Sequence, residues 1–239
     1  MHTLRLLADP ERLGIDVGAN YGIYTVVLGK SCKNCIAFEP NRSVAAAAER
    51  RARDAGLTNV EVRACALSDR DGEVTFRVPL VDGVESDAFA TIEDDNSLSG
   101  RPVHSYTVPC RRMDSFDLDP VGVIKIDAEG HETAILEGAR AVFGRDRPAV
   151  LIEVEERHKK GSVSFVENFF SDLGYEGFFL MGRHVVPLSQ FDLNMHQNTS
   201  NMEGPEIRLD AVYVNNFIFV ADDRRAEQFR MIARAGRSL

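Results

Sequence analysis

A group of acidic residues surrounds a glycine and a histidine in the stretch "VIKIDAEGHETAILEGA", residues 123–139. Asp127, Glu129 and His131 are the side chains in this stretch that could take part in catalysis. A histidine titrates near neutrality and can accept a proton from a hydroxyl group, while a carboxylate can orient the histidine or contact a substrate. The stretch therefore predicts proton-transfer chemistry where an apolar strand gives way to a helix.

Three neighbouring residues have a structural explanation beside a functional one. Glu132 lies in the first turn of the expected helix, where a carboxylate stabilises the helix dipole and caps free N–H groups. Gly130 permits a backbone bend that would direct the adjacent side chains into a crevice. Lys125 lies inside the apolar strand, and we expect it to be paired or to extend toward solvent. The predicted catalytic residues are His131, Asp127 and Glu129.

A second group of interest lies in "IDVGANYG", where a short apolar run ends in an acid and two glycines. Gly18 and Gly22 allow a tight turn and a close backbone approach to a ligand, as at the first turn of an open α/β sheet. A dinucleotide site has the spacing G-x-G-x-x-G, whereas this stretch reads D-x-G-x-x-x-G from Asp16. An acid at this place suits a ligand with a cationic amine, such as S-adenosylmethionine, better than a pyrophosphate.

The next apolar run, "CIAFEP", also ends in an acid, Glu39, 23 positions after Asp16. A carboxylate there can accept hydrogen bonds from both ribose hydroxyls of a nucleotide. Glu39 fits S-adenosylmethionine and NAD equally well, so the glycine spacing and Asp16 decide in favour of the former. An NAD-dependent oxidoreductase is the alternative, and a module that binds the cofactor without catalysis is a third reading.

The sequence supports a metal site or a redox site less well than it supports a site for S-adenosylmethionine. Glu153 and Glu155 lie on the same side of a strand in "LIEVEERH", and with Asp127 they could offer oxygen ligands to Mg²⁺. The spacing does not demand a metal, so we assign no metal ligands. Cys32 and Cys35 form a lone C-x-x-C without the second pair that a zinc site needs, and we expect reduced thiols.

The elements that must position these residues alternate between strands and helices. Such alternation predicts an α/β fold with a mostly parallel sheet, whose strands are buried on both faces. We expect an exposed or edge strand at 72–79. The strands are predicted at 12–16, 35–40, 60–67, 121–127, 149–155, 177–182 and 211–221. The helices are predicted at 21–30, 43–56, 132–144 and 162–175, with one more at the C-terminus.

The chain is predicted to form one domain, residues 1–239, with variable insertions at about 80–112 and 182–211. The second insertion holds several polar side chains and could be a substrate lid or a loop without a role. Both readings stay open for His184, Asn194, His196, Gln197 and Asn198.

Bulk properties narrow the class of partner. The 239 residues carry a formal net charge of −9, which argues against a nucleic-acid backbone as the partner. No apolar run approaches the roughly 18 residues of a membrane-spanning helix, and the N-terminus lacks the pattern of a signal peptide. We expect a cytoplasmic protein that acts on a small molecule, with its oligomeric state left open.

Five motifs in order resemble the FkbM family of S-adenosylmethionine-dependent methyltransferases. The resemblance spans about residues 13–156, and its most specific part is "KIDAEGHE" followed by "LEGA". It implies a Rossmann-like class I methyltransferase fold, with a seven-stranded, mostly parallel sheet, an antiparallel last strand and helices on both faces. The motifs are "IDVGANYGIYT", "IAFEPN", "ALSDRDGEVTF", "IKIDAEGHETAILEGA" and "LIEVEE".

The resemblance also implies an activity and a set of ligand contacts. The activity is methylation of a hydroxyl on a sugar, polyketide or other small natural product. Only about a dozen residues precede the first motif, fewer than in many relatives, and we expect this difference to affect how the substrate is covered. The implied cofactor contacts are Asp16, Gly18, Asn20, Gly22, Glu39 and Asp127, with Ala66, Leu67 and Ser68 beside the adenine.

Overall fold

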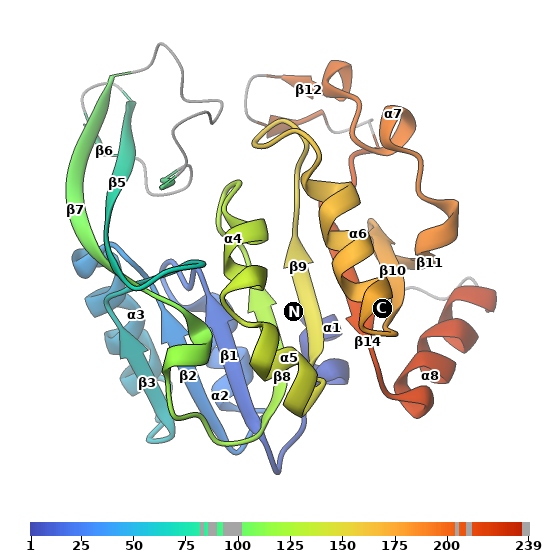
Figure 1. The fold of residues 1–239 in the computed structure, drawn as a ribbon, viewed down its shortest axis with the longest axis horizontal. Coiled ribbons are helices and arrows are strands. Elements are labelled where there is room, and N and C mark those ends of the chain that lie inside the picture. Colours follow the sequence, from blue (N-terminus) through green and yellow to red (C-terminus); the bar gives the residue numbers. More distant parts are fainter. Residues whose placement is uncertain (82–83, 86–89, 93–101, 204–205, 209–211, 236–239) are drawn as a thin grey trace.

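The central feature of the computed structural model is a twisted sheet with helices on both faces (Figure 1). The sheet contains eight strands, in the order β11-β10-β14-β9-β8-β1-β2-β3. They are β1 (Leu13–Val17), β2 (Asn34–Phe38), β3 (Val60–Arg63), β8 (Val121–Ile126), β9 (Ala149–Glu153), β10 (Glu176–Met181), β11 (His184–Pro187) and β14 (Asn216–Val220). The structure describes residues 1–81, 84–85, 90–92, 102–203, 206–208 and 212–235.

The pairing of the strands confirms a mostly parallel sheet with an antiparallel last strand. Strands β3, β2, β1, β8 and β9 pair in parallel, and β14 runs antiparallel to both β9 and β10. The expected count of seven strands was wrong by one. Gly182 turns the chain back with a φ of 62°, and β11 then pairs antiparallel with β10 as an eighth strand.

The helices divide between the two faces of the sheet (Figure 1). One face is covered by α1 (His2–Leu7), α2 (Ile23–Gly29) and α8 (Asp223–Arg234), while α3 (Arg42–Asp54) packs against α2 and β3. The other face is covered by α4 (Glu132–Glu137), α5 (Arg140–Asp146) and α6 (Ser162–Asp172).

The single helix predicted at 132–144 was wrong, because the chain forms two helices, α4 and α5, in this region. The break follows Gly138, where a Cβ atom would lie 1.9 Å from the carbonyl oxygen of Ser68. The second helix also has a distant cap, since the Asp114 carboxylate accepts the N–H groups of Ala141 and Val142 at 3.0 Å.

A smaller sheet stands beside the large one. It contains β4 (Ala66–Leu67), β5 (Gly72–Val81), β6 (Val84–Glu85) and β7 (Val103–Arg111). The predicted strand at 60–67 is therefore two strands, β3 and β4, in different sheets. The insertion expected at 80–112 also has more order than its polar sequence suggested, because β5 and β7 pair over eight positions. Its residues 82–83, 86–89 and 93–101 lie outside the described residues.

The second insertion, at 182–211, is also partly regular. It holds β11, the short helix α7 (Leu193–His196) and a small hairpin of β12 (Met202–Glu203) and β13 (Glu206–Ile207). His196 is buried and stacks on Phe191 with ring centroids 5.3 Å apart. Gln197 is buried as well, and its side-chain amide donates to the carbonyl oxygens of Val154 and Val214. His196 therefore packs within the insertion, and Gln197 links the insertion to the chain just after β9 and just before β14.

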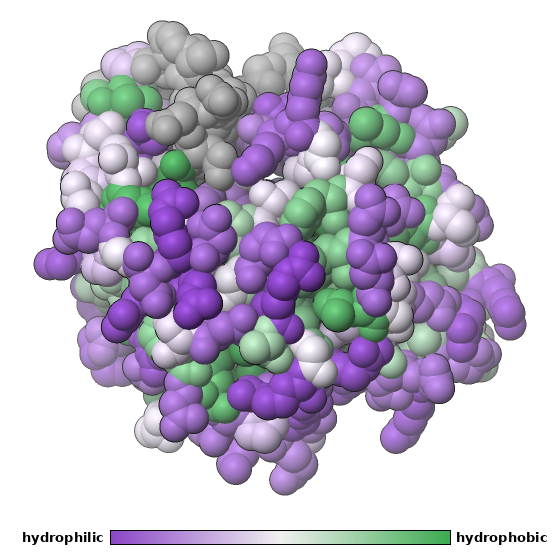
Figure 2. Space-filling view, in the orientation of Figure 1, coloured by the Kyte–Doolittle hydropathy of each residue, from purple (hydrophilic) through white to green (hydrophobic). Residues whose placement is uncertain are grey.

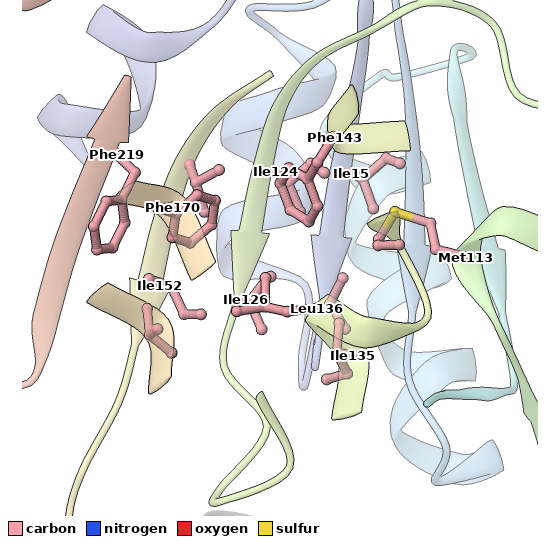
Figure 3. Close-up of a cluster of buried hydrophobic side chains, with 14 of the residues drawn as sticks. Ile15, Met113, Ile124, Ile126, Ile135, Leu136, Phe143, Ile152, Phe170 and Phe219 are labelled. Atoms are coloured by element: carbon pink, nitrogen blue, oxygen red, sulfur yellow. The ribbon is translucent and has the colours of Figure 1, made fainter. Parts of the chain in front are cut away.

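Two apolar cores hold the layers together, one on each face of the sheet. Figure 3 shows the larger core, where side chains of β1, β8 and β9 meet those of α4, α5 and α6. Phe170 of α6 stacks on Phe219 of β14 with ring centroids 4.2 Å apart. The outer surface in the view of Figure 2 is mostly hydrophilic, with smaller apolar patches. Among the described residues, no helix has the length and apolar character needed to cross a membrane.

Candidate functional site

A cavity of about 250 Å³ lies at the carboxyl ends of β3, β2, β1 and β8. The strand order reverses at β1, and open α/β sheets bind their ligands at such a switch point. Segments that are far apart in the sequence meet here. The lining residues are Val17, Gly18, Asn20, Phe38, Glu39, Pro40, Cys65, Ala66, Leu67, Phe76, Ala90, Thr91, Ile92, Asp127, Ala128, Glu129, His131 and Ile135.

The turn after β1 reaches the cavity because it carries glycine at a crowded point. Gly18 has a φ of 71°, and a Cβ atom there would lie 1.8 Å from the carbonyl oxygen of Asp127. Asn20 also has a positive φ, 48°, and lines the cavity. Gly22 does not line the cavity. A Cβ atom on Gly22 would lie 3.0 Å from Ala48, so this glycine permits the close approach of α3.

Glu39 is held in a fixed orientation at the end of β2. Its Oε2 accepts the N–H of Asn20 and its Oε1 accepts the N–H of Asn41, both at 2.9 Å. The side chain lines the cavity although only 6% of it is exposed. Each carboxylate oxygen has two lone pairs, so Glu39 can accept further hydrogen bonds from hydroxyl groups in the cavity.

The structure places Asp16 beneath the cavity and not in its lining. The residue is buried, and the hydroxyl of Thr25 donates to its Oδ2 at 2.6 Å. Burial raises the pKa of Asp16 to about 6, although the Thr25 hydrogen bond and the charge of Lys125 oppose the rise. Its Oδ1 has no hydrogen-bond partner among the described residues, and the expected contact between Asp16 and a ligand stays a prediction.

The segment after β3 contributes one apolar wall. Ala66 and Leu67, for which the resemblance implies a place beside the adenine, line the cavity. Ser68 is fully buried and does not line the cavity. Its hydroxyl contacts Nε2 of His131 at 2.9 Å and donates to Asp69 at 3.1 Å. His131 is the residue directly before α4, and it lines the cavity. The contact with the buried Ser68 hydroxyl therefore holds the His131 ring in place.

Lys125 and Asp127 form an ion pair at the end of β8. The Lys125 side chain is only 1% exposed, and its Nζ lies 3.1 Å from Oδ2 of Asp127 and 5.0 Å from the ring centroid of Tyr24. Burial alone would lower the pKa of Lys125, but nearby carboxylates, chiefly that of Asp127, raise it. Lys125 is therefore paired, as one reading of the sequence expected, and it does not extend to solvent.

The loop after β8 carries Glu129 in an unusual backbone conformation, with a φ of 48°. Its Oε2 lies 3.1 Å from Nε2 of His158, which follows β9. The same ring nitrogen lies 3.6 Å from Oε1 of Glu155. Burial, followed by the charges of neighbouring carboxylates, raises the pKa of Glu129 to about 9.

The Mg²⁺ site suggested for Asp127, Glu153 and Glu155 is not formed. Glu153 accepts a hydrogen bond from Asn215, and Glu155 is bound by Arg157 and by the hydroxyl of Tyr213 at 2.8 Å. Within the described part of the chain, no group of three or more His, Cys, Asp and Glu side chains could hold a metal ion. Cys32 and Cys35 are free thiols in the apolar core, as expected.

Sequence reasoning missed several residues of the site. Phe76 and Thr91 come from the smaller sheet and the segment beside it, and the Thr91 hydroxyl donates to the carbonyl oxygen of Glu129 at 3.0 Å. Their sequence context carried no signal of this placement. His158 did carry one, because it follows an acid-rich strand end in "LIEVEERH".

A family model and solved structures match this chain. The model of the methyltransferase FkbM domain matches residues 16–176, which is more than half of the chain. A comparison with curated protein sequences finds no significant match.

Solved structures share the fold. The FkbM methyltransferase of Methylobacillus flagellatus KT superposes with a TM-score of 0.54 at 18% identity, over 88% of this chain and 44% of that one. This chain therefore spans less than half of that structure. The Streptococcus mutans protein SMU.1697c, described as a methyltransferase and solved in complex with SAH, has a TM-score of 0.50 at 11% identity, over 92% of this chain and 94% of that one.

Proposed function

The chain belongs to the FkbM methyltransferase family, and we propose that it transfers the methyl group of S-adenosylmethionine to a hydroxyl of a small molecule. One observation carries the proposal. Most of the residues that the FkbM resemblance assigns to the cofactor line the same cavity as those that could act on an acceptor, and Glu39, Asp127 and His131 represent both groups.

The lining of the cavity fits the chemical parts of S-adenosylmethionine. Glu39 offers an oriented carboxylate to the ribose hydroxyls, and the side chains of Phe38 and Leu67 offer apolar surface to the adenine. Gly18 has no side chain, so the turn after β1 can lie close to the backbone of Asp127. When bound, the sulfonium supplies an activated methyl group for transfer.

Three side chains of the cavity can act on the acceptor hydroxyl. Asp127, Glu129 and His131 all line it, and each is oriented by a second group. Lys125 holds Asp127, His158 faces Glu129, and Ser68 holds the ring of His131. Residues held in this way can place an acceptor oxygen about 3 Å from a methyl group and receive its proton.

Other readings have weaker support. An NAD-dependent oxidoreductase would need the third glycine of a dinucleotide turn, which this sequence lacks. A protein that binds the cofactor without catalysis would not need the ionisable side chains of Asp127, Glu129 and His131 in the lining. A nucleic-acid substrate is disfavoured by the net charge of −9, so we propose a hydroxylated small molecule such as a sugar or polyketide.

The experiment that tests this function follows the methyl carbon. The purified protein is incubated with S-adenosylmethionine labelled with ¹³C in its methyl group and with a panel of sugars, glycosides and polyketide alcohols. We expect a new carbon signal at the chemical shift of a methoxy group, absent without protein. A signal from methyl on nitrogen or on a carboxylate would contradict hydroxyl methylation and leave the methyltransferase assignment intact.

A further inference from the structure

The backbone around Glu129 is fixed by contacts on both sides. Glu129 itself has a φ of 48°, a conformation that a residue with a side chain rarely adopts. The Glu132 carboxylate accepts the N–H groups of Ala128 and Gly130 at 3.2 and 3.0 Å. The Thr91 hydroxyl donates to the Glu129 carbonyl at 3.0 Å. A strained residue held in this way at the cavity wall points to a specific task for its side chain.

Gly130 allows His158 to approach this loop. Its φ is 101°, and a Cβ atom on it would lie 3.1 Å from Cβ of His158. The side chain of His158 is 4% exposed, and its Nε2 lies 3.1 Å from Glu129 and 3.6 Å from Glu155. One buried ring nitrogen thus faces two carboxylates, of which the first lines the cavity and the second lies behind it.

The two carboxylates differ in their environment. Burial would raise the pKa of Glu155, but the nearby His158 ring and the hydrogen bonds from Arg157 and Tyr213 lower it to about 2. Glu155 is therefore a permanent anion. Burial and neighbouring carboxylates raise the pKa of Glu129 to about 9, so at neutral pH Glu129 carries a proton. The titratable and charged groups around Glu129 are His158, Arg157, Asp127, Glu132, Glu153 and Glu155.

This arrangement would block catalysis by Glu129 until its proton leaves. We propose that Glu129 holds a proton beside the ring of His158, and that the positive charge of a sulfonium in the cavity expels it, so that Glu129 becomes a proton acceptor only when the methyl donor is bound. The inference rests on the proposed function. Glu129 would be a catalytic residue, and His158 would be a positioning residue that holds the Glu129 carboxyl group in place at the cavity wall.

The chemical balance of the transfer is simple. The acceptor oxygen forms a bond to the methyl carbon as the bond between that carbon and sulfur breaks, and the sulfonium becomes the neutral thioether S-adenosylhomocysteine. The hydroxyl proton passes to the Glu129 carboxylate. Loss of the sulfonium charge then restores the state in which Glu129 is protonated, with the Glu155 anion near it.

Proton release on ligand binding tests the inference without an acceptor. Binding of S-adenosylmethionine and of S-adenosylhomocysteine is measured by calorimetry at pH 8, in two buffers that differ in ionisation enthalpy. We expect the charged ligand to release more protons than the neutral thioether, by a difference approaching one per site. Glu129→Gln should remove this difference, and His158→Gln should reduce it.

The comparison between protein variants isolates the role of Glu129. The amino group of each ligand titrates equally in every variant, so it does not affect a comparison between variants. Glu153, whose pKa is raised to about 8, is unchanged in Glu129→Gln, so any protons that it releases would still be measured in that variant. Glu73→Gln changes an exposed glutamate of β5 and should behave as the unaltered protein. Equal proton release by both ligands, or a difference that persists in Glu129→Gln, overturns the inference alone. Absence of binding by either ligand overturns the proposed function and the inference with it.

Discussion

Glu39 and Glu129 illustrate how neighbouring contacts decide the task of a buried carboxylate. Glu39 is fixed by two backbone N–H groups, which suits a residue that binds hydroxyls without changing its charge. Glu129 faces a histidine and several acids, and its pKa is raised to about 9, which suits a residue that gains and loses a proton. Both are glutamates after a strand, and the sequence alone does not distinguish them.

Local motifs identified the residues that come from one segment. Gly18, Asn20 and Glu39 lie in turns directly after strands, and the structure places all three in the cavity lining. Asp16 and Ser68 were harder to place, because a motif does not say whether a side chain faces the cavity or the interior. His158 was missed because its contact with Glu129 depends on how two adjacent strand ends pack.

Replacing Lys125 with methionine tests whether this buried cation balances the acids around it. The variant leaves the charge of Asp127 without its partner, and Asp16 and Glu153 also lose the nearby cation. We expect the free energy of unfolding, measured with urea, to fall by about 3 kcal/mol, near the lower end for a broken buried pair because Asp127 is 30% exposed. Lys30→Met, at an exposed position, should change it by less than about 0.5 kcal/mol. Similar losses in both variants would contradict the balancing role.

At the scale of elements, apolar runs predicted the parallel strands well, because β1, β8 and β9 are buried on both faces. The sequence did not show where contacts between distant segments interrupt a helix. The helix after β8 divides at Gly138 because Ser68 passes close to it, and α5 is capped by Asp114 from a distant segment. Strand β11 was hidden because its four residues carry little pattern of their own.

Gly130→Ala tests the loop between β8 and α4, which brings Glu129 close to His158. The substitution meets a φ of 101° and a close contact with His158, so we expect a loss of about 1 kcal/mol or more in the free energy of unfolding. It should also weaken the effect of Glu129 on proton release. Gly144→Ala is the matched control, because Gly144 lies in α5 with nothing near its added Cβ, and we expect a gain of about 0.5–1 kcal/mol. Equal thermal stability of the two variants would contradict this account.

At the scale of the whole molecule, buried acids should control the dependence of stability on pH. Burial is the main cause that raises the pKa of Asp16 to about 6, Glu132 to about 7, Glu153 to about 8 and Glu129 to about 9. Between pH 6 and 9 the native state therefore binds more protons than the unfolded state, and stability falls as pH rises. Glu155, whose pKa is lowered to about 2, acts oppositely and only at lower pH, where its stabilising contribution is lost as pH falls.

Thermal unfolding of the ligand-free protein measures this effect. We expect the melting temperature to fall between pH 6 and pH 9 by at least the 2–4 °C that about 1 kcal/mol produces in a protein of this size. The fall should be shallower in Glu129→Gln, which cannot ionise. A melting temperature that is constant or rises over this range would show that the acids are not buried as described.

The proposed function requires that the cavity at the carboxyl ends of the parallel strands binds S-adenosylmethionine with Glu39 at its ribose. Calorimetric titration with S-adenosylhomocysteine, and with NAD as the comparison, tests it most directly. We expect micromolar binding of S-adenosylhomocysteine alone, weakened about 10- to 100-fold in Glu39→Gln through the loss of charged hydrogen bonds worth about 1.5–3 kcal/mol. Binding of NAD instead, or an affinity for S-adenosylhomocysteine that Glu39→Gln leaves unchanged, would contradict it.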